Sequence, residues 1–330
     1  MTGLPMVVEA VKSASKVIHQ LLKVKPSEQV MIIADPETDM RMVYALAGEV
    51  ENAGGEYTIT IMPTRSMERS LEMTEVIKRG MEAADVVISM TRSSGASTYG
   101  EPRGRLREAK KIRTMSMCMR DLENWTKGGA TADYEELRRN ALALIKRWQP
   151  GRRLELTTPA GTHLTAEIGN HIIGLEAGFA EKPGEHGAFS DGEVSQGPNE
   201  GTANGVVVVD GPMCYFGMPD HPVILEIRNG RAEEIKGEGR AAAALRDLIA
   251  KVENSNNFAE VGIGINPNSL RNGDFEEEKK ALGTAHIALG KNTSYGGTTK
   301  FMVHMDMVLY SPMLKIDGRV LVKDGRLQLD

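Results

Sequence analysis

The stretch from Phe301 to Tyr310 combines chemically active residues with the pattern of a β-strand. Apolar residues fill alternate positions, which is typical of a strand, where side chains two residues apart share one face. His304 and Asp306 therefore lie together on one face, beside Met302 and Val308. An imidazole and a carboxylate are costly to bury on an apolar face unless a partner satisfies them. A divalent metal ion or a structural ion pair would serve.

Two neighbouring segments repeat this pattern. Ala259 to Asn266 places Glu260 opposite an apolar face, and Thr284 to Gly290 does the same with His286. The residues that accompany them are mostly glycine or alanine, which leaves room for an ion and a small ligand. Each residue taken singly is typical of a solvent-facing sheet position, but together with the first segment they favour a metal site.

Glu193 is a further candidate, in the segment 191–200 just before the predicted strand 205–210. The candidate metal ligands are thus Glu193, Glu260, His286, His304 and Asp306. This mixed set of carboxylates and imidazoles suits Zn, Mn, Co or Fe(II). It is larger than one catalytic zinc takes from protein, and it fits two ions about 3.5–4 Å apart.

Five sequence blocks, in the same order, resemble the thermophilic aminopeptidase T family of two-metal leucyl aminopeptidases. They are Asp-Gly-Glu-Val at 191–194, Gly-Thr-Ala-Asn-Gly at 201–205, Glu-Val-Gly-Ile-Gly-Ile-Asn-Pro at 260–267, Ala-Leu-Gly-Thr-Ala-His-Ile-Ala-Leu-Gly at 281–290 and His-Met-Asp at 304–306. The resemblance covers roughly residues 150–330, makes the same five residues the metal ligands and implies a homodimer. The chain departs from the family at Ala281, where an acidic residue is common, and at Thr293, where a functional tyrosine is expected; Tyr295 follows two residues later.

A more distant resemblance is to the 2,5-dihydroxypyridine 5,6-dioxygenases, which share this fold and bind one Fe(II). It rests on the Pro-Asn-Glu block at 198–200 and on the His-x-Asp pair at 304–306. That family has a histidine at the place of Glu260 and an apolar residue at the place of Glu193. An iron triad of two histidines and one carboxylate would use His286, His304 and Asp306.

That triad leaves Glu193 and Glu260 unexplained, so the sequence favours a metallohydrolase over the Fe(II) dioxygenase. In the hydrolase, two ions would activate a water that attacks the amide of a peptide or of a small cyclic substrate. Glu200, or an oxygen of Glu193, is the expected general base, and Tyr295 is expected to stabilise the oxyanion. A third alternative is a non-catalytic dimeric scaffold with a structural metal.

The fold class predicted is α/β. Residues 1–147 alternate strands and helices, which indicates a doubly wound, mostly parallel sheet without a nucleotide-binding motif. Residues 148–330 are predicted to form a β-rich metal-binding domain, in which Asn229-Gly230 marks a hairpin. Arg92 or Arg120, after the third and fourth predicted strands, could hold a substrate carboxylate.

Composition excludes several classes of protein. The chain has 330 residues, a net charge of −5 and a pI near 5.9, which do not indicate a nucleic-acid-binding surface. The two cysteines, Cys118 and Cys214, are expected to be buried thiols in a reducing compartment. We find no signal-peptide pattern and no apolar run of membrane-spanning length, so the expected location is the cytoplasm.

Overall fold

The computed structural model describes residues 3–65, 73–91, 97–118, 121–300 and 304–329. The chain forms two compact units, Met1–Thr131 with Ala177–Asp191 and Ala132–Glu176 with Gly192–Asp330. The predicted boundary after residue 147 differs from this division in two respects. Residues 132–147 group with the second unit, and the chain returns to the first unit at 177–191 to supply one more strand.

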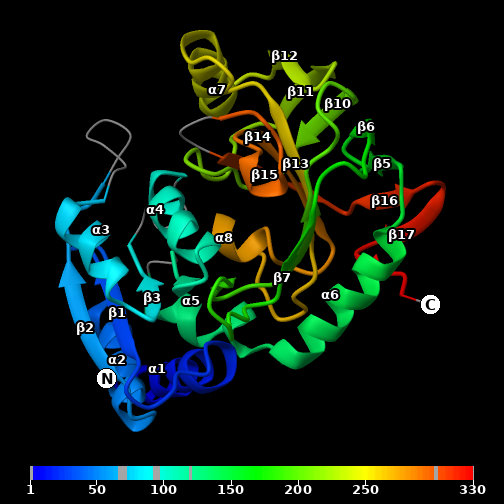
Figure 1. The fold of residues 1–330 in the computed structure, drawn as a ribbon. Helices are drawn as coiled ribbons and strands as arrows, with labels where there is room; N and C mark the ends of the chain where they lie inside the picture. The colour runs from blue at the N-terminus through cyan, green and yellow to red at the C-terminus, as the bar shows by residue number, and fades with distance from the viewer. Residues whose placement is uncertain (1–2, 66–72, 92–96, 119–120, 301–303, 330) are drawn as a thin grey trace. The chain divides into compact units, whose positions relative to one another are not determined.

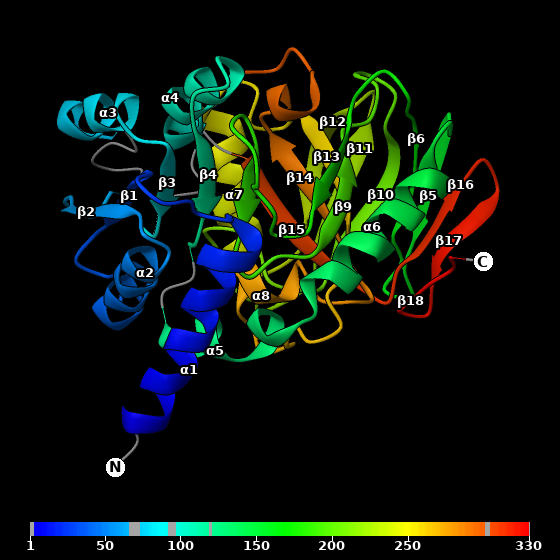
Figure 2. The same cartoon turned by 60° about the horizontal axis from the view of Figure 1, so that its bottom comes forward.

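The first unit contains a parallel sheet of five strands in the order β2-β1-β3-β4-β8. Its strands are β1 (Gln29–Ala34), β2 (Glu56–Ile61), β3 (Val86–Ser89), β4 (Arg113–Ser116) and β8 (His186–Ala188). Its helical segments are α1 (Gly3–Ser15), the π-helix Lys16–Leu21, α2 (Met40–Asn52), α3 (Glu75–Glu82), α4 (Ser97–Glu108), α5 (Leu122–Thr126) and a 3₁₀ turn, Gly128–Thr131. Helices lie on both sides of this sheet (Figure 2). The predicted doubly wound sheet is confirmed.

Two details of this unit differ from the sequence-based expectation. The segment 91–100 after β3 has the serine- and glycine-rich composition of a loop, yet α4 begins within it at Ser97. Strand β8 was not predicted, and it places His186 in this sheet, where Nδ1 lies 2.8 Å from Thr114 Oγ1. Arg92 and Arg120 lie outside the described residues, so their proposed role in binding a carboxylate stays a prediction.

The second unit contains two sheets. One has eight strands in the order β12-β11-β10-β6-β5-β16-β17-β18, several of which lie side by side in Figure 2. These strands are β5 (Arg153–Thr157), β6 (His163–Glu167), β10 (Asn204–Val209), β11 (Val223–Arg228), β12 (Arg231–Lys236), β16 (Met313–Ile316), β17 (Arg319–Lys323) and β18 (Arg326–Leu327). The predicted hairpin between β11 and β12 is confirmed, with positive φ at both Asn229 and Gly230.

The other sheet has five antiparallel strands in the order β15-β14-β13-β9-β7. They are β7 (Ile173–Glu176), β9 (Glu193–Gln196), β13 (Phe258–Gly264), β14 (Thr284–Gly290) and β15 (His304–Tyr310). All residues of β9, β13 and β14 are buried, so both faces of the centre of this sheet are covered. Glu193 was expected just before a strand, but it begins β9 within this same sheet.

The helices of the second unit are α6 (Tyr134–Trp148), α7 (Arg240–Lys251) and α8 (Phe275–Glu278), with a 3₁₀ turn at Thr293–Tyr295. Helix α6 packs against β7 and β9, where Trp148 Nε1 donates a hydrogen bond of 2.9 Å to Gln196 Oε1. Helix α7 packs against β11 and β12 at the edge of the larger sheet (Figure 1). No helix in the described part of the chain is long and apolar enough to cross a bilayer. Cys118 and Cys214 are half-buried and form no disulfide.

Candidate metal centre

Strand register brings the predicted ligands onto one face of the five-stranded sheet. Glu260 on β13 lies opposite Ala288 on β14, which lies opposite Asp306 on β15. The small side chain of Ala288 separates the two carboxylates in this row. One row further along, His286 on β14 lies opposite Gly262 on β13. Because these positions differ by two residues along each strand, their side chains share a face, as the sequence predicts.

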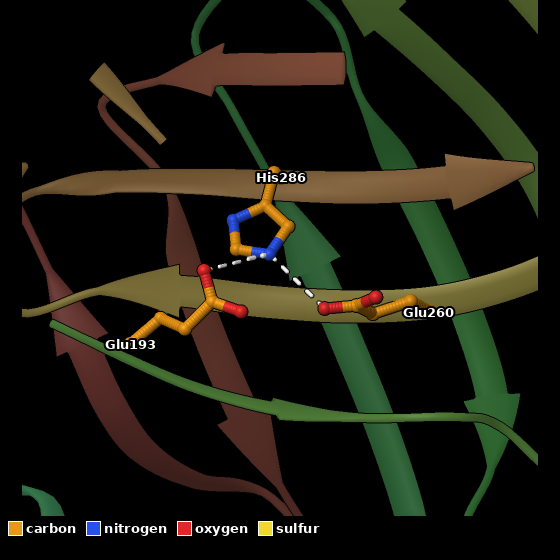
Figure 3. A group of neighbouring side chains, drawn as sticks. All are labelled: Glu193, Glu260 and His286. Atoms are coloured by element: carbon orange, nitrogen blue, oxygen red, sulfur yellow. Dashed lines mark hydrogen bonds and ion pairs between the residues drawn. The ribbon is translucent and has the colours of Figure 1, made fainter. Parts of the chain in front are cut away.

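The five predicted ligands form two groups of donors that could hold a metal ion. The donor atoms of Glu193, Glu260 and His286 lie within 4.8 Å of one another, and so do those of Glu260, His304 and Asp306. Glu260 belongs to both groups. Each group offers one imidazole and two carboxylates, the kind of donor set that divalent transition metals accept. Figure 3 shows Nε2 of His286 between the carboxylates of Glu193 and Glu260.

The space beside Glu260 is used differently from what the sequence suggests. Gly262 was expected to leave room for an ion, but the ring of His286 lies over it. A Cβ atom at Gly262 would come within 2.1 Å of His286 Nε2. The glycine therefore makes room for the imidazole, from which Nε2 reaches Glu260 Oε1 at 3.1 Å.

The group with His304 fits a bound ion well. Nδ1 of His304 lies 2.7 Å from the carbonyl oxygen of Lys291, and a carbonyl can only accept a hydrogen bond. Nδ1 therefore carries a proton, and Nε2 faces Glu260 and Asp306, where an ion would replace the proton that this nitrogen otherwise carries. Asp306 Oδ1 is buried, lies 3.0 Å from this nitrogen and makes no hydrogen bond. These are the features of a ligand pair that shares a cation.

Charge around the centre explains the pKa values of its groups. Burial by itself lowers the pKa of His304, but the carboxylates of Asp306 and Glu260 outweigh burial and hold it well above its ordinary value. Burial and the charge of Glu176 raise the pKa of Glu193, against the opposite effect of Lys280. The centre thus concentrates negative charge, which favours a bound cation.

Three side chains at the centre were missed by the sequence analysis. Lys279 Nζ lies 3.1 Å from Asp306 Oδ2, and Lys280 Nζ lies 2.8 Å from Glu193 Oε2 and 2.9 Å from Glu176 Oε2. The run Glu276–Lys280 is typical of a solvated helix face, yet Lys280 is 3% exposed. No local pattern distinguishes such a buried lysine from a surface one.

Glu200 belongs to neither donor group, and its hydrogen bonds give it a structural role. Its carboxylate accepts hydrogen bonds from Asn292 Nδ2 and from the backbone and side chain of Thr298, and so holds the loop that contains Lys291 and Tyr295. These bonds from Asn292 and Thr298 lower the pKa of Glu200 to about 2. A carboxylate of that pKa is a weak base, so the predicted role as general base does not suit Glu200.

Tyr295 is buried on the same face of the sheet as the ligands. Its hydroxyl lies 2.8 Å from Ser195 Oγ on β9, and its ring centroid lies 6.4 Å from that of His304. Burial and the charges of Glu260 and Glu176 hold the pKa of Tyr295 well above its ordinary value. The phenol therefore stays protonated, as an oxyanion donor must be, but Ser195 already engages its hydroxyl.

Comparison with known proteins supports both resemblances inferred from the sequence. A model of the 2,5-dihydroxypyridine 5,6-dioxygenase family matches residues 10–329. The curated 2,5-dihydroxypyridine 5,6-dioxygenase of Pseudomonas putida is 26% identical over 205 residues, and this alignment spans 58% of each protein. The alignment thus covers less than two thirds of that relative's length.

Two solved structures share the fold over nearly the whole chain. The 2,5-dihydroxypyridine dioxygenase from Pseudomonas putida superposes with a TM-score of 0.81 at 20% identity, over 98% of this chain and 97% of that one. Wild-type AmpT from Thermus thermophilus gives a TM-score of 0.72 at 18% identity, over 97% and 99%. At these identities the two structures establish the fold alone, whereas the family model matches almost the entire sequence. The chain therefore belongs to the 2,5-dihydroxypyridine 5,6-dioxygenase family.

Proposed function

We propose that this protein is a metal-dependent dioxygenase that opens the ring of a small hydroxylated N-heterocycle. The observation that carries this proposal is the donor group Glu260, His304 and Asp306, in a chain of the dioxygenase family. A redox-active ion such as Fe(II), when bound there, would supply the electron transfer that lets dioxygen react with an aromatic ring. The group contains two carboxylates and one histidine, so it differs from the two-histidine triad that the sequence offered as the dioxygenase alternative.

The residues around this group would orient each ligand. Lys291 O fixes the ring of His304, Lys279 holds Asp306 through Oδ2, and His286 contacts Glu260 through Oε1. Such outer contacts keep metal ligands in place and set their protonation. The side chain of His304 is 24% exposed while that of His286 is fully buried, so solvent reaches the centre at His304. We propose that substrate and dioxygen approach there.

The test is oxygen consumption by protein loaded with Fe(II) under anaerobic conditions and then mixed with 2,5-dihydroxypyridine in aerated buffer. The proposal expects uptake of one O₂ per substrate, loss of the substrate's ultraviolet absorbance and no activity in a His304→Ala variant. Exposed His163, on β6 of the same unit, provides the matched control, since His163→Ala should retain full activity. Iron-loaded protein that consumes no oxygen with any hydroxylated pyridine would contradict the proposal.

A two-metal hydrolase is the second candidate. The observation in its favour is that Glu260 belongs to both donor groups, as a carboxylate that bridges two ions would. Support for it would be hydrolysis of an aminoacyl amide by protein loaded with Zn or Mn, lost on chelation. The two candidates also differ in the number of ions per chain, and the geometry of Lys280 bears on that number.

A further inference from the structure

The Glu193–Glu260–His286 group contains a cation of its own, the ammonium group of Lys280. The side chain of Lys280 is 4% exposed, and Nζ lies within ion-pair distance of both Glu193 and Glu176. A buried ammonium group is tolerated only where carboxylates pair with it. This lysine is therefore part of the centre rather than a surface residue nearby.

The oxygen that Lys280 contacts is the Glu193 oxygen that lies nearest to His286. Glu193 Oε2 lies 3.6 Å from His286 Nε2 and 2.8 Å from Lys280 Nζ. An ion between Glu193 and His286 would lie about 2.1 Å from this oxygen, and hence no more than about 5 Å from Nζ. In a buried site, a divalent ion and an ammonium group at that separation repel each other strongly.

The other group shows the opposite arrangement. Asp306 presents Oδ1 to His304 Nε2 at 3.0 Å, while Lys279 contacts Oδ2 at 3.1 Å. The lysine thus uses the carboxylate oxygen that faces away from the histidine. Lys279 can hold Asp306 in place without occupying the position of an ion.

The backbone fixes Lys280 at this place. Its carbonyl oxygen accepts a hydrogen bond of 2.9 Å from Asn266 N. The segment runs so close to β13 that a Cβ atom at Gly264 would come within 2.8 Å of the Lys280 carbonyl carbon and 2.3 Å of Ala281 O. Only glycine permits this approach, so the fold itself directs the lysine toward Glu193.

The hydrogen-bond partners of the two histidines also differ between the two donor groups. The carbonyl of Lys291 fixes the proton of His304 on Nδ1 and leaves Nε2 for a metal. Nδ1 of His286 is buried without a hydrogen-bond partner in the described part of the chain, and Nε2 faces Glu260 Oε1. A histidine that binds a metal usually donates its other ring N–H to a carbonyl or a carboxylate, and among the described residues Nδ1 of His286 has no such partner. His286 thus suits a donor to Glu260 better than a metal ligand.

We infer that Lys280 takes the place of a second divalent ion: one ion binds through Glu260, His304 and Asp306, and Lys280 keeps the Glu193–Glu260–His286 group free of metal. This inference rests on the proposed function in one respect, namely that the centre binds a metal. It goes beyond that function because it assigns the residue that keeps the second donor group free of metal.

The test counts bound ions without measuring activity. Chelator-treated full-length protein is saturated with Mn²⁺, freed of excess metal and analysed for Mn per chain, and its electron paramagnetic resonance spectrum is recorded. The inference expects one Mn²⁺ per chain with the spectrum of an isolated ion. In the Lys280→Met variant, the inference expects two Mn²⁺ per chain with the spectrum of a coupled pair. In the double variant Lys280→Met/Glu193→Gln, it expects one Mn²⁺ per chain again. The matched control, Lys251→Met at an exposed position of α7, should still bind a single ion.

Two Mn²⁺ per chain in the unchanged protein, or one in a folded Lys280→Met variant, would overturn the inference. If Lys280→Met does not fold, the single variant Glu193→Gln takes its place in the test. The inference expects one Mn²⁺ per chain both in the unchanged protein and in Glu193→Gln. A fall from two ions to one would contradict the inference. The proposed function can fail independently of this inference. One ion per chain without oxygen consumption would agree with the inferred number of ions but would exclude the dioxygenase activity.

Discussion

At the scale of single residues, each candidate ligand of the His304 group has a second contact. The ring of His304 is set by a backbone carbonyl, Asp306 by Lys279 and Glu260 by His286. Such contacts reduce the freedom that each ligand would lose on binding an ion, and they select its protonation state. Loss of one ligand should therefore act on metal affinity much more than on folding.

Replacement of His304 by Ala should weaken metal binding more than the roughly 10–100-fold that loss of an outer hydrogen-bond partner costs. The side chain is partly exposed at the end of β15, so the truncation should leave the fold intact. Isothermal titration with Mn²⁺ measures the affinity, and circular dichroism checks the fold. An unchanged affinity would remove His304 from the ligand set.

Glu200 gives a prediction for pH. Its pKa in the folded protein, about 2, is below the ordinary value of 4.5, so its hydrogen bonds stabilise the loop fully above pH 4.5. This stabilisation should be lost as the pH falls from about 4.5 toward 2. The amide resonance of Thr298, observed by NMR, should titrate near pH 2 in the unchanged protein and stay constant in Glu200→Gln. A midpoint near 4.5 would show that the carboxylate does not hold the loop.

At the scale of elements, the antiparallel register of the strands positions the candidate ligands. Glu260 and Asp306 come from β13 and β15, and β14 between them contributes the small residue Ala288 to the same row. Glycines on β13 admit groups that any side chain would exclude, namely the ring of His286 at Gly262 and the Lys280 backbone at Gly264. The glycines of β13 are therefore as important to the site as the candidate ligands, because they leave space for these groups.

Gly262→Ala should displace the imidazole of His286, because the new methyl group would lie 2.1 Å from Nε2. Glu260 would then lose its contact with His286, and metal affinity should fall by roughly 10–100-fold. Gly48→Ala is the matched control, since no atom lies within 4 Å of the added Cβ and the residue lies within α2. That control should bind metal normally and be slightly more stable. Equal affinities in the two variants would contradict the packing of His286 over Gly262.

At the scale of the whole molecule, all predicted metal ligands belong to the second unit. The parallel sheet of the first unit has a core of its own, which includes Arg113, 1% exposed and paired with Glu28. Metal binding is thus expected to stabilise the unit that holds the ligands. The predicted homodimer, the cytoplasmic location and the identity of the substrate stay predictions.

Removal of the metal should lower the free energy of unfolding of the second unit. At a free-ion concentration 100 times the Kd, the loss amounts to about 2.7 kcal/mol, because the ion binds only the folded state. Thermal unfolding with and without chelator measures it, and the transition temperature should rise with Mn²⁺ concentration. His304→Ala should unfold at the same temperature under both conditions. A chelator effect of equal size in that variant would place the stabilising ion elsewhere.

Local pattern was sufficient for the strands and for the types of the ligands. Alternation with a period of two is a property of neighbouring residues, so β13, β14 and β15 and their polar face could be predicted from the chain alone. The doubly wound sheet followed from the order of strands and helices in the same way. The sequence also carried the resemblance to the dioxygenase family, although it favoured the aminopeptidase as the nearer relative.

Only the tertiary structure decided what surrounds those residues, because the separation of two residues in the sequence does not give the distance between them in the fold. Glu200 could have reached the centre but instead holds a loop, and Glu193 belongs to a strand that pairs with β13. Lys280, within a run of charges typical of a surface helix, becomes buried because Gly264 lets its backbone approach the sheet. The sequence by itself determined that two histidines and several carboxylates lie on one face of this sheet. The packing of the chain decided which of their carboxylate oxygens face a lysine.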